Sequence, residues 1–392
     1  MLTVEEALRH CLALAAPLPC EIVALRHANG RIMPMAALAT RDQPPFPASA
    51  MDGYAVAGDP TAGTRFALIG EAGAGHAFDG AVLGGQAVRI FTGAPVPMGA
   101  TRVILQEDVT RDGLAVTVKP GADAATHVRP AGQDFRAGDL LSPRRLGPND
   151  LALLAAMNIP NVTVTRRPAV ALIATGDELV MPGEPPAPSQ IIASNTFALA
   201  ALIEREGGIA RILPIARDTP AALRHVLTLA LDADLVITIG GASVGDHDLV
   251  ASVTAAMGIE RAFWRIAMRP GKPLMAGRLQ GKPILGLPGN PVSAIVCCHL
   301  FVLPMIRALQ ADPNPEPQPR RARLASAVDA NGPRAHYMRA RLTQTDDGPV
   351  IAPFDRQDSA LLTILSQANA LLIRPIDDMH RTVGDAVSYL AI

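Results

Sequence analysis

The feature that most constrains this chain is an alternation of short apolar runs and helical patterns between residues 168 and 310. The runs Ala169–Ala174, Leu235–Ile239 and 284–287 are almost continuously apolar, which is typical of parallel strands buried on both faces. Helical patterns cover the ranges 194–206, 220–231 and 291–309. Two glycines end the first of them. Alternating strands and helices predict an α/β layer fold with a parallel sheet.

Proline-rich segments divide the rest of the chain. The sequence D-Q-P-P-F-P at 42–47 breaks any regular element, so it predicts a crossing between domains, and 312–319 predicts a stiff linker. Glycine-rich short strands after the first segment indicate a small all-β unit, and short strands after the second indicate a β-barrel. The expected domains are a mixed N-terminal linking domain (1–41 and 130–167), a small β domain (42–129), the α/β domain (168–311) and a C-terminal β-barrel (320–392).

Composition excludes several classes of protein. Hydrophobic residues make up 49% and charged residues 18%, which excludes a disordered chain. The net charge is −1, from 35 basic and 36 acidic residues without like-charge blocks, so we expect no nucleic-acid or membrane-surface partner. We also expect no membrane helix, because no apolar run reaches ~18 residues. Four cysteines without C-x-x-C spacing, and Glu5 and Glu6 before the first apolar stretch, favour the cytoplasm.

Three loops that follow apolar runs are rich in glycine, and they predict a ligand site. They begin at Thr175, Gly240 and Pro288, where the strands end, and the second includes Gly241 and Ser243. Ligands of open α/β sheets bind outside the carboxyl ends of the strands, and glycines there let backbone N–H groups approach an anion. In the third loop, Gly289 is followed by Asn290 at an expected helix N-cap, where the dipole favours negative charge. No G-x-G-x-x-G or P-loop motif is present, so we expect a phosphate-bearing ligand outside those two classes.

Acidic side chains in the same loops have two interpretations. Asp177 and Glu178 follow the first strand, and Asp246 and Asp248 lie in the second loop. Carboxylates beside a phosphate indicate Mg²⁺, which takes oxygen ligands from both. The other interpretation is that each acid caps a helix, as acids after strands often do.

A basic turn follows at 264–273. Arg265, Arg269 and Lys272 lie within eight residues, and Lys272 is one of the chain's three lysines. In a nearly neutral chain this turn is the best local anion site, and the alternative is a solvated basic turn.

Six segments carry a family resemblance. They are P-F-x-x-S-A-M-D-G-Y-A at 45–55, F-T-G-A-P-V-P at 91–97, T-G-D-E-L at 175–179, G-G-x-S-V-G-x-x-D at 240–248, P-G-K-P at 270–273 and L-P-G-N-P-V-S at 287–293. Over essentially the whole chain, they resemble the MoeA family of molybdopterin molybdenumtransferases, which includes the E-domain of gephyrin. The resemblance implies a central MogA-like α/β three-layer domain, a small all-β lid domain, a mixed linking domain and a C-terminal β-barrel. It also implies that molybdate and adenylyl-molybdopterin react, with Mg²⁺ assisting, to give molybdenum cofactor and AMP.

The resemblance assigns roles to individual residues. Positions that match functionally important family residues are Asp52, Thr92, Asp134, Glu178, Asp218 and Asp248, and we assign Glu178 and Asp248 to the metal. Expected substrate or anion contacts are Gly240, Gly241, Ser243, Arg265, Arg269, Lys272, Pro288, Gly289, Asn290, Arg339 and Ser359. Arg265 and Arg269 stand where relatives often carry lysine, and arginine keeps the anion-binding role.

The resemblance also implies partners. In the family, the small β domain brings Asp52 and Thr92 to the crevice of the other subunit, so a homodimer is expected. Further expected partners are a MogA-type adenylyltransferase and molybdoenzyme chaperones. The alternatives are that the chain itself adenylylates molybdopterin, as MogA-type proteins with the same α/β domain do, or that it is a dimeric scaffold. The full four-part layout argues against the first, and the lack of a second fused module argues against the second.

Overall fold

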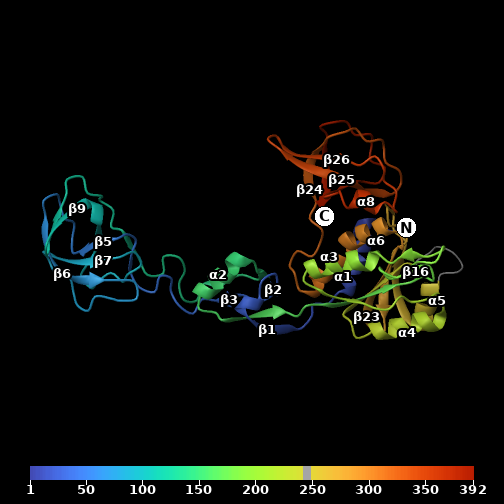
Figure 1. Ribbon diagram of the computed structural model, residues 1–392, viewed down its shortest axis with the longest axis horizontal. Coiled ribbons are helices and arrows are strands. Elements are labelled where there is room, and N and C mark those ends of the chain that lie inside the picture. Colours follow the sequence, from blue (N-terminus) through green and yellow to red (C-terminus); the bar gives the residue numbers. More distant parts are fainter. Residues whose placement is uncertain (242–248) are drawn as a thin grey trace. The chain divides into compact units, whose positions relative to one another are not determined.

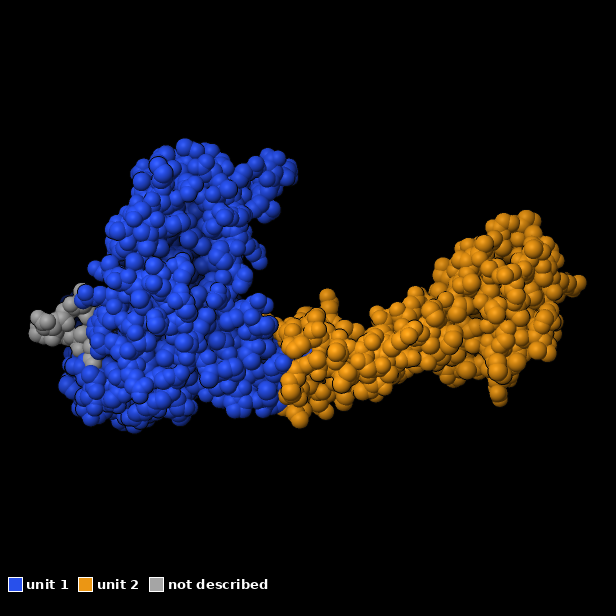
Figure 2. Space-filling view, turned by 180° about the vertical axis from the view of Figure 1, so that it is seen from behind, with its two compact units in different colours: residues 1–21, 30–34, 164–392 blue, residues 22–29, 35–163 orange. Residues whose placement is uncertain are grey.

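The computed structural model describes residues 1–241 and 249–392 (Figure 1). The chain divides into two compact units, which Figure 2 shows in two colours. Unit 1 comprises residues 1–21, 30–34 and 164–392, and unit 2 comprises 22–29 and 35–163. Residues 1–21 therefore make their contacts within unit 1, and the expected linking domain (1–41 and 130–167) stays a prediction.

Unit 1 is built around a six-stranded sheet. Its strand order is β18 (Ile209–Ile212), β15 (Ala169–Ala174), β19 (Leu235–Ile239), β23 (Lys282–Leu287), β22 (Met275–Leu279) and β20 (Ile259–Trp264). The first four strands are parallel, and β22 and β20 continue the sheet antiparallel. The alternation of strands and helices in the sequence therefore gives the expected parallel sheet. Two parallel strands need a crossover connection, and the segments between these strands supply it.

Helices cover both faces of this sheet. They are α1 (Val4–Leu14), α3 (Asn195–Arg205), α4 (Pro220–Ala230), α5 (Leu249–Ala256), α6 (Pro291–Cys297) and α7 (Leu303–Leu309), with a π-helical turn η3 (Cys298–Val302) between the last two. Helices α1, α3, α6 and α7 share one buried cluster with the sheet, and α4 and α5 share a second cluster with its other face. The α/β domain thus has three layers, as expected, and Figure 1 shows helices on both sides of β23.

Helix α1 belongs to this core for a reason visible in its sequence. Thr3 and Glu6 form the expected capping box, with the Glu6 amide donating to Thr3 Oγ1 at 3.2 Å. Val4, Ala7, Cys11 and Leu14 then recur at helical spacing, and all four are buried in the cluster that contains β15 and β19.

The stretch Pro291–Leu309 is apolar enough to be compared with a membrane span. It is 19 residues long with a mean hydropathy of 2.0, so by length and composition it passes as a membrane span. Within the structure 78% of it is buried, against α1, α3 and the sheet. A helix that is apolar all round is typical of the centre of a large core, which accounts for its composition.

The C-terminal part of unit 1 is a closed β-barrel. Its strands are β24 (Arg320–Leu324), β25 (Ala335–Thr345), β26 (Gly348–Pro353), β27 (Ala370–Arg374) and β28 (Ala386–Ala391). The order β25-β26-β24-β28-β27 closes because β27 also pairs with β25. The two-residue strand β21 (Met268–Arg269) adds to the outside of β25, and a short helix α8 (Leu362–Leu365) precedes β27.

Unit 2 contains the expected small β domain. Its sheet has the order β8 (Arg102–Leu105), β5 (Gly53–Val56), β7 (Gln86–Ile90), β6 (Arg65–Ala72), β10 (Ala115–Val118) and β9 (Val109–Asp112). Tyr54, Phe66, Ile104 and Val116 form part of one buried cluster, and Val88, Ile90 and Val103 form part of another. The small β domain therefore has a hydrophobic core of its own, made of these two clusters.

Short elements complete the chain. In and near unit 2 they are β1 (Cys20–Ala24), η1 (Leu25–His27), β2 (Ile32–Met33), β3 (Ala37–Leu38), β4 (Ala48–Ser49), η2 (Gln106–Asp108), β11 (Val128–Arg129), β12 (Leu140–Leu141), β13 (Arg144–Arg145), α2 (Pro148–Ala156) and β14 (Asn161–Thr165). In unit 1 they are β16 (Leu179–Val180) and β17 (Ile191–Ile192), which pair in parallel beside the carboxyl end of β15.

Candidate functional site

A cavity of approximately 550 Å³ lies at the carboxyl ends of the parallel strands of unit 1. Its walls include Thr175 after β15, Gly240 after β19 and Pro288 after β23. Strand register brings these loops to one level, because Ala174 pairs with Ile239, and Ile239 pairs with Leu287. The loops expected to converge do converge.

Two glycines at the end of β19 permit close backbone approach. Gly240 and Gly241 have φ of +91° and +65°, in the left-handed region. A Cβ on Gly240 would lie 2.9 Å from the Thr175 carbonyl oxygen, and a Cβ on Gly241 would collide with Val250. Only glycine fits both constraints. The Gly240 N–H donates to the Leu287 carbonyl at 3.1 Å, whereas the Gly241 N–H makes no hydrogen bond to a described residue.

Glu178 lines the cavity, and neighbouring residues restrict the backbone of the loop that carries it. Gly176 has φ of +144°, and a Cβ there would collide with the Glu178 carboxylate. Arg217 donates to the carbonyls of Asp177 at 3.1 Å and Leu179 at 3.0 Å, on either side of Glu178. Sequence reasoning missed Arg217, which positions the acid by fixing the backbone on both sides of it.

Asp218 reaches the same loop but stays outside the cavity wall. The Asp177 amide donates to Asp218 Oδ2 at 3.3 Å, and the Asp218 amide donates to Asp177 Oδ1 at 3.1 Å. This reciprocal pair closes the loop that follows β15 onto the loop before α4. Asp218 therefore contacts the loop that carries Glu178, and its expected functional role stays a prediction.

The N-terminus of α3 forms another wall that sequence reasoning missed. Asn195 donates to the Gly289 carbonyl at 2.7 Å, and this bond ties α3 to the loop after β23. Thr196 is 2% exposed and lines the cavity, and its hydroxyl has no hydrogen-bond partner among the described residues. The available signal was S-N-T immediately before a helical pattern, which marks a helix start.

Asn290 is the N-cap of α6, as expected, but its side chain makes a different bond. Its amide donates to Ser359 Oγ at 3.0 Å, while the Ser359 carbonyl accepts the Val292 amide at 3.1 Å. The backbone carbonyl of Ser359 thus accepts an N–H of the first turn of α6, which the Asn290 side chain does not do. The neighbouring Gly289 and Ala360 both line the cavity.

Arg339 is nearly fully buried and supports the Ser359 loop. Its guanidinium donates to the carbonyls of Asp358 at 2.7 Å and Arg356 at 3.3 Å, and Gln357 bonds to its backbone on both sides. Burial lowers the pKa of Arg339. Through these bonds the guanidinium contacts the backbone next to Ser359, and the expected anion contact of Arg339 stays a prediction.

The basic turn does not face the cavity as a unit. Lys272 directly precedes Pro273, which lines the cavity, whereas none of Arg265, Arg269 and Lys272 is in its wall. Arg269 donates to Asn331 Oδ1 at 2.8 Å, on the barrel, and its pKa is lowered by burial and by the neighbouring Arg334 and Arg374.

The reason for the position of Arg269 is its strand pairing. Arg269 pairs with His336 on β25, and His336 pairs with Arg374 on β27, so the three residues form a row across adjacent strands. Burial, together with Arg269, Arg339, Arg374 and Arg334, lowers the pKa of His336 to about 3. The expectation that the turn adjoins the glycine loops therefore needs correction for Arg269.

In unit 2, Asp52 and Thr92 lie together. The Asp52 carboxylate accepts the Thr92 amide and the Thr92 hydroxyl, each at 2.7 Å, and these bonds lower the pKa of Asp52. Asp134 lines a different cavity of unit 2, with Phe46 and Gly93.

Two expected site residues, Ser243 and Asp248, lie outside the described residues, as does Asp246. Within 1–241 and 249–392, no group of three or more His, Cys, Asp or Glu side chains could hold a metal ion.

Fold and site together define a multidomain α/β protein with a polar ligand crevice at the carboxyl ends of its parallel strands. Family models match in order: the MoeA N-terminal region (domain I and II) at residues 2–158, a probable molybdopterin binding domain at 171–308, and the MoeA C-terminal region (domain IV) at 321–392. The chain belongs to the MoeA family of molybdopterin molybdenumtransferases.

Individual relatives agree over nearly the whole chain. It is 35% identical to the molybdopterin molybdenumtransferase of Nostoc sp., covering 95% of this chain and 88% of the relative. It is 36% identical to that of Haemophilus influenzae, covering 99% and 98%. A crystal structure of the molybdopterin biosynthesis MoeA protein from Pyrococcus horikoshii matches with a TM-score of 0.83 and 32% identity, covering 100% of this chain and 99% of that one.

Proposed function

We propose that this chain is a molybdopterin molybdenumtransferase, in which adenylyl-molybdopterin and molybdate react to give molybdenum cofactor and AMP. The names of relatives such as those from Nostoc sp. and Haemophilus influenzae support the activity. The observation that carries it is the crevice of unit 1, where three strand ends, two left-handed glycines and one carboxylate meet in one cavity.

The crevice suits a phosphate-bearing substrate. The backbone N–H of Gly241 and the N-terminus of α3 would present donors and a favourable dipole to an anion. The buried Thr196 hydroxyl adds a donor that no described residue uses. Of the described residues, Glu178 is the one charged side chain in the cavity wall, so backbone amides, hydroxyls and side-chain amides would supply the contacts to an anion.

The donor set also fits Mg²⁺ held together with the substrate. Mg²⁺ is usually bound by one or two carboxylates with waters and substrate phosphates, so a full cage of protein ligands is not required. Glu178 would supply one carboxylate, and Asp248 is our proposed second ligand. When bound, the ion would polarise the phosphoanhydride of the substrate and offset its charge. Arg217 and Gly176 keep the Glu178 carboxylate in place for this role.

We further propose that the active form is a homodimer in which Asp52 and Thr92 of one subunit complete the crevice of the other. The Asp52 carboxylate supports this assignment, because two hydrogen bonds from Thr92 hold it in one orientation before any ligand binds. A MogA-type adenylyltransferase would supply the substrate, molybdoenzyme chaperones would receive the product, and all would share the cytoplasm.

The direct test is molybdate-dependent release of AMP from purified adenylyl-molybdopterin. We expect release that requires molybdate and Mg²⁺ and that yields cofactor able to reconstitute a molybdoenzyme. An adenylyltransferase would instead form adenylyl-molybdopterin from ATP and molybdopterin, and a scaffold would do neither. Absence of AMP release with all components present would contradict the proposal.

A further inference from the structure

Unit 2 contains a second cavity, of approximately 700 Å³, that the crevice chemistry does not use. It lies where the two crossing segments between the small β domain and the rest of unit 2 run side by side. Gln43, Phe46 and Ala48 line it from the first segment, and Arg129 and Asp134 line it from the second. Its volume falls within the ~300–1,000 Å³ typical of small-ligand sites.

The backbone around this cavity is firmly connected. The Gln43 amide donates to the Phe135 carbonyl at 2.8 Å, and the Asp134 amide donates to the Gln43 carbonyl at 2.9 Å. Arg129 pairs with Ala48 in the β4–β11 ladder. The two crossing segments therefore form a narrow two-stranded frame, and the side chains on it have defined positions.

Polar side chains around the cavity have no partners within the protein. Arg41, Gln43, Arg129, Gln133 and Asp134 all line it, and within the described part of the chain none of these side chains makes a hydrogen bond or an ion pair. Elsewhere in unit 2 comparable groups are engaged, for example Arg102 with Asp59 at 3.0 Å and Asp42 with the Ala137 amide at 2.8 Å. A carboxylate, two amides and two guanidiniums are thus available to a ligand.

The cavity also has an apolar, aromatic part and a link to Asp52. The Phe46 ring is 38% exposed and lines the cavity with Pro44 and Pro45. Gly93 lines it as well, and Gly93 directly follows Thr92, the donor to Asp52. A flat ring could pack on Phe46 while its edges meet the polar groups.

We propose that this cavity binds the pterin end of the substrate, an assignment that rests on the proposed function. A pterin presents a 2-amino group and an adjacent ring N–H side by side, two parallel donors that match one carboxylate, here Asp134. Its carbonyl and ring nitrogens are acceptors and donors for the Gln43 and Gln133 amides. Arg41 and Arg129 would hold an anionic substituent, because guanidinium groups bind carboxylate and phosphate in a planar fork.

The same chemistry disfavours the adenine end of the substrate. The Watson–Crick edge of adenine offers one donor beside an acceptor, so a carboxylate meets an unfavourable lone pair there. Adenine therefore fits amide side chains better than Asp134. On this chemistry the pterin, and not the adenine, is the ligand of the unit 2 cavity.

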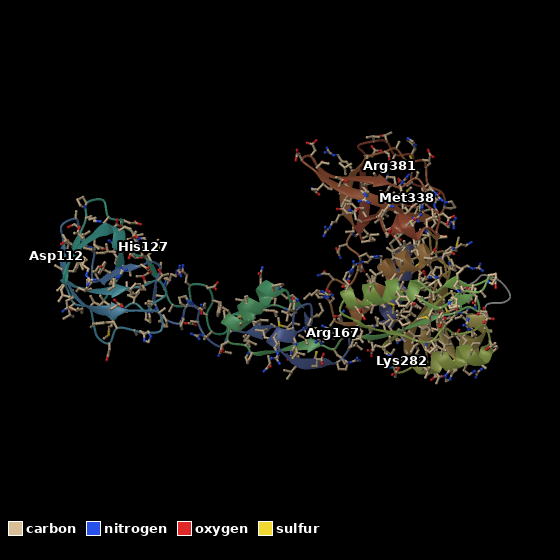
Figure 3. All side chains as sticks on the ribbon, viewed as in Figure 1. Asp112, His127, Arg167, Lys282, Met338 and Arg381 are labelled. Carbon is tan, nitrogen blue, oxygen red and sulfur yellow. The ribbon has the colours of Figure 1, made fainter. Side chains whose placement is uncertain are left out.

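Binding of two separate probes to the full-length chain tests this assignment. The probes are pterin-6-carboxylate, followed by its intrinsic fluorescence, and AMP, followed by calorimetry. We expect Asp134→Asn to weaken pterin-6-carboxylate by about tenfold or more and to leave AMP binding unchanged. Phe46→Ala should weaken the pterin as well, and Phe46→Tyr should restore it, because the ring face is retained. Asp112→Asn, an exposed carboxylate on β9 labelled in Figure 3, is the matched control and should change neither.

Three results would overturn the assignment. These are no pterin-6-carboxylate binding to the native chain, unchanged pterin binding in both Asp134→Asn and Phe46→Ala, or loss of pterin binding through Thr196→Val in the other cavity. A shift in sedimentation of Asp134→Asn or Phe46→Ala would also overturn it, since the cavity would then be an assembly surface. Failure of AMP release with intact, Asp134-dependent pterin binding would instead contradict the proposed function alone.

Discussion

The Asp52 carboxylate accepts both the backbone amide and the side-chain hydroxyl of Thr92, each at 2.7 Å. The two residues are 40 positions apart, and they meet because β5 pairs with β7, so that the segments flanking these strands lie together. Both bonds favour the ionised carboxylate and lower the pKa of Asp52 below its ordinary value of 3.8.

The first prediction concerns this pair. Thr92→Val removes the hydroxyl donor and keeps the backbone donor, so the pKa of Asp52 should rise toward 3.8 and the acid limb of activity should move to higher pH. The measurement is a carboxyl-carbon NMR titration of Asp52. Thr92→Ser keeps the hydroxyl and should retain the low pKa. An equal pKa in the Val and Ser variants would show that the hydroxyl bond has no effect.

The second prediction concerns Glu178. Glu178→Gln keeps the size of the side chain and removes one charge of the proposed metal ligand set, so AMP release should fall by orders of magnitude. Thermal unfolding should stay near that of the native chain, because Glu178 is exposed. Glu204→Gln, an exposed acid on α3, serves as the matched control. Native turnover of the Glu178 variant at saturating Mg²⁺ would favour a purely structural acid.

The third prediction concerns assembly. Asp52→Ala and Glu178→Ala chains should each be inactive, and mixing them should restore about a quarter of native activity, since half of the dimers would be mixed and each would hold one intact site. Activity is measured before and after exchange of subunits. A stable, fully active monomer in sedimentation would refute the shared site.

The fourth prediction concerns molybdate and the basic turn. Lys272→Ala should raise the molybdate concentration for half-maximal turnover by about tenfold or more, because charge-assisted hydrogen bonds contribute ~1.5–3 kcal/mol each. Arg269→Ala should change it little, because the Arg269 side chain bonds to Asn331 on the barrel. Affinity for adenylyl-molybdopterin should fall less. Sulfate should compete weakly with molybdate in the native chain and hardly at all in Lys272→Ala.

Two exposed or peripheral cations provide controls for that experiment. Lys282, at the start of β23 and labelled in Figure 3, and Arg321 on β24 lie outside the turn, and their Ala variants should keep native molybdate dependence. If Lys272→Ala keeps it too and loses nucleotide affinity instead, the turn binds phosphate and the placement of molybdate is wrong.

The fifth prediction concerns pH. The pKa of His336 is lowered from 6.5 to about 3, chiefly by burial and then by the four surrounding arginines, so the unfolded chain binds a proton here at a higher pH than the folded one. The stability linked to the neutral imidazole is complete above about pH 6.5 and is lost as pH falls toward 3, with a slope of at most ~1.4 kcal/mol per pH unit.

Removing the imidazole should therefore flatten this pH dependence. His336→Gln should show a smaller loss of unfolding free energy between pH 6.5 and 4 than the native chain, as measured by denaturant titration at each pH. His76→Gln replaces an exposed histidine and should match the native slope. Identical slopes in all three proteins would contradict the depressed pKa.

Much of the fold follows from local sequence patterns. The helices expected at 194–206 and 220–231 are α3 (Asn195–Arg205) and α4 (Pro220–Ala230), and the apolar runs are the parallel strands β15, β19 and β23. These patterns depend on neighbours two to four residues away, which the sequence displays directly. The glycine loops were predictable for the same reason, because strands that run parallel must present their carboxyl ends at one edge.

What tertiary structure alone decided is where particular side chains point and what they contact. Arg269 lies two residues from Gly271 in sequence, yet its pairing with His336 directs it to the barrel row with Arg374. Arg339 donates to the loop that carries Ser359. Arg217 donates to the carbonyls of Leu179 and Asp177, which lie 38 and 40 positions earlier in the chain, on either side of Glu178. Register and long-range hydrogen bonds set these destinations, and a one-residue shift of register would reverse the face of every side chain on a strand. Composition and periodicity therefore determined the layers and the loops, whereas the pairing of distant strands determined which charges meet.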